Sequence, residues 1–114
     1  MKTLDQIPLT QDQQDALSDL RLRLSGKFDI LSITLFGSAA RGEAEEGSDL
    51  DLLVITSRPL PRAVRHQITD IVFEINLKFG TNFSTLVVDR ESWDSGLYSV
   101  LPLRDEIVRE GVPV

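Results

Sequence analysis

Residues 35–55 read LFGSAARGEAEEGSDLDLLVI and combine a glycine turn with two closely spaced carboxylates. Gly37 and Ser38 follow one apolar run, and Asp49 and Asp51 open the next. Because residues i and i+2 of an extended strand point to the same face, the two aspartates are predicted to project side by side. Such a pair offers the oxygen ligands that Mg²⁺ prefers. A glycine turn and a pair of carboxylates are the smallest set of groups that metal-assisted phosphoryl or nucleotidyl transfer requires.

Each half of this pattern has a simpler interpretation when it is taken alone. Gly37 and Ser38 could form only a tight turn, and Asp49 and Asp51 could be solvated acids at the start of a strand. Strands disfavour aspartate, however, and two like charges on one face repel each other unless a cation lies between them. The two halves in this order therefore favour a phosphate and metal site over the simpler alternatives.

The segment from Phe36 to Ile55 contains Gly-Ser-x-x-Arg-Gly, an acidic insert and Ser-Asp-x-Asp-Leu. This order resembles the polymerase-beta-like nucleotidyltransferase superfamily, and the small size resembles its minimal branch, the MNT domain proteins. The resemblance implies one domain over residues 1–114, in which Asp49 and Asp51 are catalytic and hold one or two Mg²⁺ ions. It also implies ATP or another nucleoside triphosphate as substrate. Four residues are assigned to nucleotide binding: Gly37, Ser38, Arg41 and Ser48.

The chain departs from the pattern of that superfamily at the third carboxylate, which serves as metal ligand and general base. Ser84 is predicted to take its place on the next strand, with Asn82 as the less favoured alternative; neither carries a negative charge. Asp89 lies at the far end of that strand with the opposite parity, so we do not assign it as the base. Losing a general base typically costs about 10²–10⁴-fold in rate.

Two hypotheses follow from the resemblance and this departure. The first is an enzyme, a nucleotidyltransferase that moves AMP or another NMP to an acceptor hydroxyl on a partner HEPN-domain toxin, as in MntA-type antitoxins of HEPN/MNT pairs. The second is a catalytically weak or inactive MNT-like subunit that neutralises its partner by contact. Substitution of Asp49 and Asp51 would abolish the first activity and spare the second.

The composition of the chain also limits the classes of substrate and partner. The chain has 114 residues, no cysteine and a net charge of −6, without the basic stripe of a free-standing nucleic-acid binder. A long nucleic acid is therefore a poor substrate, whereas a Mg²⁺-chelated nucleotide or a basic partner surface is compatible. We find no apolar run that could cross a membrane and no secretory leader, and we expect a cytoplasmic protein. An oligomer remains possible.

The pattern of apolar residues predicts a small α/β (α+β) fold, a mixed β-sheet flanked by helices that pack largely on one face. Thr10 and Gln13 are expected to form a capping box at the start of the first helix. Gly26 and Gly80 are expected to end two helices. Ser92 or Asp94 is expected to open a loose helical turn. The expected elements are a helix from Thr10, strands at 30–36 and 49–55, a short helical start at Ser38, a helix after Pro61, a strand at 83–88 and a helix from Pro102.

Overall fold

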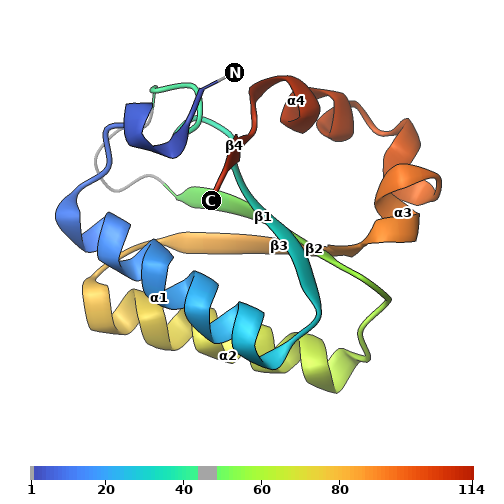
Figure 1. The fold of residues 1–114 in the computed structure, drawn as a ribbon, viewed down its shortest axis with the longest axis horizontal. Coiled ribbons are helices and arrows are strands. Elements are labelled where there is room, and N and C mark those ends of the chain that lie inside the picture. Colours follow the sequence, from blue (N-terminus) through green and yellow to red (C-terminus); the bar gives the residue numbers. More distant parts are fainter. Residues whose placement is uncertain (1, 44–48) are drawn as a thin grey trace.

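A single mixed sheet of four strands lies at the centre of the computed structural model, which describes residues 2–43 and 49–114 (Figure 1). The strand order is β3-β2-β1-β4. β1 pairs antiparallel with β2 and β4, whereas β2 and β3 run parallel and are joined by the crossover helix α2. The strands are β1 (Ile30–Phe36), β2 (Leu50–Thr56), β3 (Phe83–Asp89) and β4 (Val112–Pro113).

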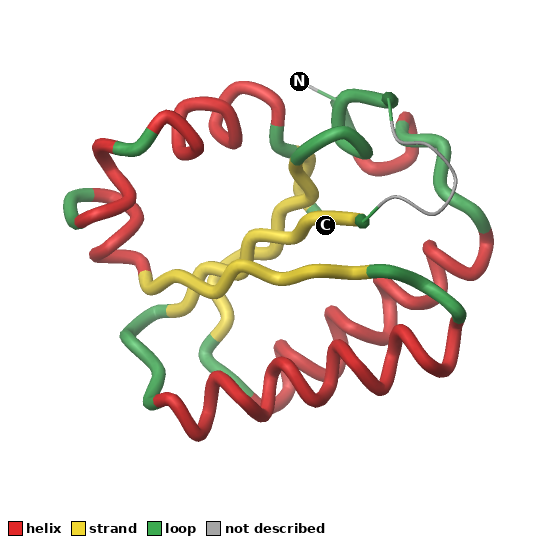
Figure 2. Tube along the Cα trace, turned by 180° about the vertical axis from the view of Figure 1, so that it is seen from behind, coloured by secondary structure: helices red, strands yellow, loops and turns green. Residues whose placement is uncertain are grey.

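The helices cover both faces of this sheet (Figures 1 and 2). The long helices α1 and α2 pack on one face, where Leu4 of η1 also contacts the core, and α3, η2 and α4 lie against the other face. Our expectation that helices pack largely on one face was therefore incomplete, because Leu53, Ile55 and Val88 are also apolar and bury the second face against Ile107. The helical elements are η1 (Leu4–Gln6), α1 (Gln11–Lys27), α2 (Arg62–Phe79), α3 (Arg90–Asp94), η2 (Leu97–Val100) and α4 (Pro102–Glu110).

The ends of the long helices follow local sequence signals, with one exception. Thr10 caps α1 through a capping box with Gln13, as predicted, and Gly80 ends α2 in the left-handed conformation with φ 69°. The prediction that Gly26 ends the first helix is wrong. α1 continues through Gly26 to Lys27, and Phe28 closes it in an extended conformation with its N–H donating to the Leu24 carbonyl.

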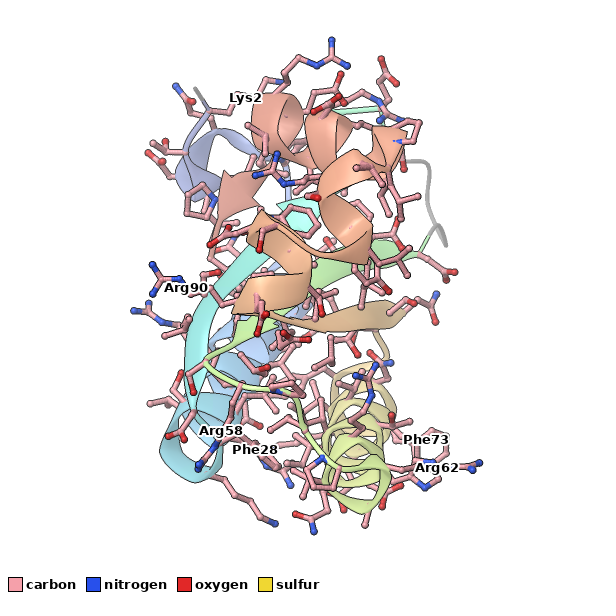
Figure 3. All side chains as sticks on the ribbon, turned by 90° about the vertical axis from the view of Figure 1, so that its right-hand side faces the viewer. Lys2, Phe28, Arg58, Arg62, Phe73 and Arg90 are labelled. Atoms are coloured by element: carbon pink, nitrogen blue, oxygen red, sulfur yellow. The ribbon has the colours of Figure 1, made fainter. Side chains whose placement is uncertain are left out.

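The main core lies between the sheet and the two long helices. Its fully buried side chains come from α1, from both central strands and from α2, and they include Leu20, Leu35, Leu52 and Ile75. Phe73 and Arg62 instead project from α2 away from the sheet (Figure 3), and Phe73 is 63% exposed. The helices within the described ranges 2–43 and 49–114 include none that is long and apolar enough to span a membrane.

Two further local predictions need correction, and one short strand was missed. The helical turn α3 is opened by Asp89, not by Ser92 or Asp94, because the Asp89 carboxylate accepts the Ser92 backbone N–H. The segment after Ser38 forms hydrogen-bonded turns and no helix. The two-residue strand β4 was not predicted; Val112 pairs with Leu35 on β1.

Candidate functional site

The glycine turn begins directly after the last residue of β1. Gly37 has φ 78°, in the left-handed region that favours glycine. The turn closes through three backbone hydrogen bonds: the Arg41 N–H donates to the Gly37 carbonyl at 3.3 Å, Gly42 to Ala39 at 3.1 Å and Glu43 to Ser38 at 2.9 Å. Ala39 and Ala40 are buried, so apolar contacts anchor the middle of the turn to the core.

The turn touches the carboxylate of Asp51. Phe36, the residue before Gly37, is the register partner of Asp51 on the antiparallel strand β2. A Cβ atom added at Gly37 would lie 2.6 Å from Oδ2 of Asp51. A side chain at position 37 would force the Asp51 carboxylate to shift, so the glycine allows the turn backbone and this carboxylate to lie close together.

Asp49 and Asp51 interact electrostatically, and their side-by-side placement on one face stays a prediction. Asp49 is exposed just before β2, and Asp51 is half-buried within it. Burial raises the pKa of Asp51 above its ordinary value, and the charge of Asp49 raises it further. A divalent cation would remove both penalties. The donor set of carboxylate oxygens beside an open turn therefore fits Mg²⁺, which Asp49 and Asp51 would hold.

Ser84 stands next to Asp51 on the neighbouring strand. The parallel register pairs Asp51 with Ser84, and Ser84 is exposed. The alternative, Asn82, lies before the first residue of β3, and its carbonyl accepts the Leu50 N–H at 2.9 Å. Across the described part of the chain, no three His, Cys, Asp or Glu side chains form a group that could hold a metal ion. That Ser84 takes the third-carboxylate position stays a prediction, and the register is compatible with it.

Arg41 makes contacts that sequence reasoning missed. Its guanidinium lies among three carboxylates: Nε is 3.2 Å from Glu43 Oε2, and Nη1 is 3.0 Å from Glu106 Oε1 and 3.3 Å from Glu110 Oε2. Hydrogen bonding to Glu43 and then to Glu110 raises the pKa of Arg41. Its predicted role as a phosphate ligand remains a prediction. No local sequence signal connects Arg41 with two glutamates more than sixty positions away.

Other residues singled out in the sequence have identifiable places. Ser48, predicted to bind nucleotide, lies outside the described residues. Asp89 caps α3, which agrees with its exclusion as a catalytic base. Lys2 adds an unpredicted cation beside the turn, since its Nζ lies 3.8 Å from where a Cβ on Gly42 would stand. Figure 3 labels Lys2 near α4.

Comparisons with known proteins agree with this arrangement. A protein of Methanocaldococcus jannaschii named "Putative protein adenylyltransferase" is 48% identical over 77 residues, which are 66% of this chain and 51% of that protein. This chain thus spans about half the length of that curated relative. The described fold resembles a solved "putative minimal nucleotidyltransferase" with 24% identity and a TM-score of 0.61, over 94% of this chain and 98% of the other.

A second solved structure is a toxin–antitoxin with AMP-PNP. It is 18% identical with a TM-score of 0.57, and the match covers 91% of this chain and 72% of that one. At these identities the two structural matches establish a shared fold. The family model for the nucleotidyltransferase domain matches residues 17–99, a segment that holds the glycine turn, both aspartates and Ser84. With most of its length and all of β1, β2 and β3 inside that match, this chain belongs to the nucleotidyltransferase domain family.

Proposed function

We propose that this protein is a Mg²⁺-dependent nucleotidyltransferase that transfers AMP from ATP to an acceptor hydroxyl on a partner protein, a HEPN-domain toxin. The observation that carries the proposal is the contact between the Gly37 backbone and the Asp51 carboxylate, with Asp49 adjacent. It supports a single site in which the turn would bind the phosphates and the two aspartates would hold the metal. The adenylyltransferase relative supports the choice of AMP, and the toxin–antitoxin neighbour supports a partner protein.

In this mechanism the turn and the two carboxylates have separate tasks. Gly37 and Ser38 present backbone N–H groups and a hydroxyl to the β and γ phosphates without a side chain in the way. Asp49 and Asp51 would hold the metal, which would supply charge neutralisation at the phosphates and a lowered pKa at the acceptor hydroxyl. The acceptor oxygen bonds to the α-phosphorus as the bond to pyrophosphate breaks. The neutral Ser84 hydroxyl is a poor proton acceptor, so the hydroxyl proton leaves to solvent.

Calorimetric titration with ATP, with and without Mg²⁺, tests the site. We expect Mg²⁺-dependent binding that is lost in an Asp49→Asn/Asp51→Asn variant and retained in Asp70→Asn, which removes an exposed aspartate from α2. Transfer is then measured as labelled AMP that remains attached to the co-purified partner. Equal binding with and without Mg²⁺, or binding unaffected by the double substitution, would rule out the proposed metal site.

One observation favours a second function, neutralisation of the partner by contact alone. Ser84 stands in register with Asp51, where an acidic residue would strengthen metal binding and supply a base. The net charge of −6 also suits a basic partner surface. The two functions are distinguished in cells that express the toxin: the Asp49→Asn/Asp51→Asn variant still protects if contact suffices, and fails to protect if AMP transfer is required.

A further inference from the structure

We infer that Glu106 and Glu110 of α4 are positioning residues for the glycine turn, and that they act through Arg41. Arg41 then serves as a link between the turn and α4 and does not contact the phosphates. The inference concerns the order of the turn in the free protein. Only its consequence for nucleotide affinity rests on the proposed function.

The link consists of contacts across a large sequence separation. Arg41 Nη1 reaches Glu106 and Glu110, which lie one helical turn apart on α4 and so face the same side. The Arg41 side chain is 34% exposed, and those of Glu106 and Glu110 are 40% and 35% exposed. The backbone of the same arginine also closes the turn, because its N–H donates to the Gly37 carbonyl. One residue therefore connects α4 to the loop that touches Asp51.

The end of α4 is itself fixed to the sheet, which makes it a suitable anchor. A Cβ atom on Gly111 would lie 2.6 Å from Cγ2 of Thr34 on β1, so the helix end packs directly on the strand. Val112 of β4 then pairs with Leu35 of β1. Ile107 of α4 is buried against the second face of the sheet. Glu106 and Glu110 thus project from a rigidly held segment toward a turn that starts two residues after Leu35.

The balance of charge explains why Arg41 stays with the glutamates. Three carboxylates surround one guanidinium, and they engage Nε and Nη1. A phosphate group that displaced them would leave Glu43, Glu106 and Glu110 without their shared cation, beside a polyanion. Like charges held that close repel, so the exchange is unfavourable. The backbone of the turn and Lys2 remain available to a phosphate.

The test compares Arg41→Gln, Glu106→Gln/Glu110→Gln and the triple variant. Matched controls are Arg23→Gln and Glu74→Gln, which break an ion pair of 2.6 Å between α1 and α2, away from the turn. The first measurement is amide hydrogen exchange of Arg41, Gly42 and Glu43 in the ligand-free protein. The second is calorimetric affinity for Mg²⁺-ATP, with thermal unfolding recorded for every variant.

We expect Arg41→Gln and the double glutamate variant to accelerate exchange in the turn by a similar factor. Exchange in the triple variant should be no faster than in these two variants, since the effects of substitutions within one ion-pair network are not additive. Affinity for Mg²⁺-ATP should fall about tenfold in all three variants, a change worth about 1.4 kcal/mol, and remain unchanged in both controls.

Two results would overturn the inference. The first is loss of affinity in Arg41→Gln with unchanged or tighter binding in the double glutamate variant, which would make Arg41 a phosphate ligand that the glutamates restrain. The second is unchanged exchange in the turn. If the unmodified protein binds no Mg²⁺-ATP, the proposed function fails, and exchange in the turn alone decides the inference.

Discussion

Oδ2 of Asp51 lies only 2.6 Å from the point where the Cβ atom of a larger residue at position 37 would stand. This proximity makes Gly37 a direct determinant of the carboxylate position. The turn conformation and the position of the Asp51 carboxylate are therefore not independent: whatever moves the backbone at Gly37 also moves Asp51, and the reverse.

Gly37→Ala should abolish Mg²⁺-dependent ATP binding, because the new methyl group must displace the Asp51 carboxylate. Gly80→Ala is the matched control, since Gly80 also has positive φ but nothing lies within 4 Å of its Cβ position. Both substitutions carry the left-handed strain of about 1–2 kcal/mol. Calorimetry and urea unfolding should show greater destabilisation for Gly37→Ala and loss of binding in that variant alone. Intact binding in Gly37→Ala would contradict the close contact.

Asp51→Asn should stabilise the metal-free protein at neutral pH while it removes Mg²⁺ binding. Burial and the charge of Asp49 both raise the pKa of Asp51, so its ionised form costs folding free energy that the neutral amide does not. Thermal unfolding in EDTA should therefore give a higher midpoint for the variant. Mg²⁺ should raise the midpoint of the unmodified protein only.

Asp49→Asn is the control for that comparison. Asp49 is exposed, so its replacement removes the repulsion between the two carboxylates but recovers no desolvation cost. The rise in the unfolding midpoint in EDTA should therefore be smaller than for Asp51→Asn. A lower midpoint for Asp51→Asn than for the unmodified protein would show that the Asp51 carboxylate has a stabilising partner in the folded state.

The parts of the fold with local causes could be predicted from the sequence. The capping box at Thr10, the helix between Pro61 and Gly80, and the electrostatic interaction of Asp49 with Asp51 all depend on residues within a few positions of one another. The main strands follow from runs of apolar residues, and their bounds differ from the prediction by no more than one residue.

The remaining features depend on contacts between distant segments. β4 contains two residues, and it exists only because Val112 meets Leu35 on β1. The ion pairs of Arg41 with Glu106 and Glu110 also have no nearby sequence pattern that predicts them. Two glutamates on a helix are equally compatible with a face that only contacts solvent. Local patterns therefore located the candidate site and the helix from Pro102, but not the ion pairs that join the two.

Asp89 should give the folded protein a pH-dependent contribution through its cap on α3. Hydrogen bonds from the Ser92 hydroxyl and N–H, at 2.7 and 3.0 Å, lower the pKa of Asp89. The contribution is fully present above the unfolded pKa of about 3.9 and is lost as pH falls through the lower folded value.

Urea unfolding of two variants separates the charge of Asp89 from its geometry. Asp89→Ala removes the cap and should lower the unfolding free energy by about 1 kcal/mol at pH 7. Asp89→Asn keeps a capping oxygen without the charge, so it should lower the unfolding free energy by less, and its difference from the unmodified protein should shrink as the pH falls below about 3.9. If the loss of unfolding free energy in Asp89→Asn did not change with pH, this result would contradict the lowered pKa of Asp89.

Asn76 fixes the start of β3 from the neighbouring helix, and its loss should be costly although its side chain is polar. Its amide donates to the Phe83 carbonyl at 3.0 Å and accepts the Phe83 N–H and the Thr81 hydroxyl, both at 2.9 Å. Asn76→Ala would leave these groups unpaired, and Phe83 and Thr81 are buried, so we expect a loss of about 1–3 kcal/mol. Leu77→Ala truncates the adjacent, 69% exposed side chain and should cost less than about 0.5 kcal/mol.

Hydrogen exchange locates the effect of Asn76→Ala within the sheet. Phe83 precedes Ser84, the register partner of Asp51, so the start of the strand that pairs with Asp51 is aligned through this amide. Exchange at the Phe83 N–H should accelerate in Asn76→Ala and stay unchanged in Leu77→Ala. If the two variants were equally stable and equally protected, packing of β3 against β2 alone would set the position of Ser84, and Asn76 would contribute nothing to the site.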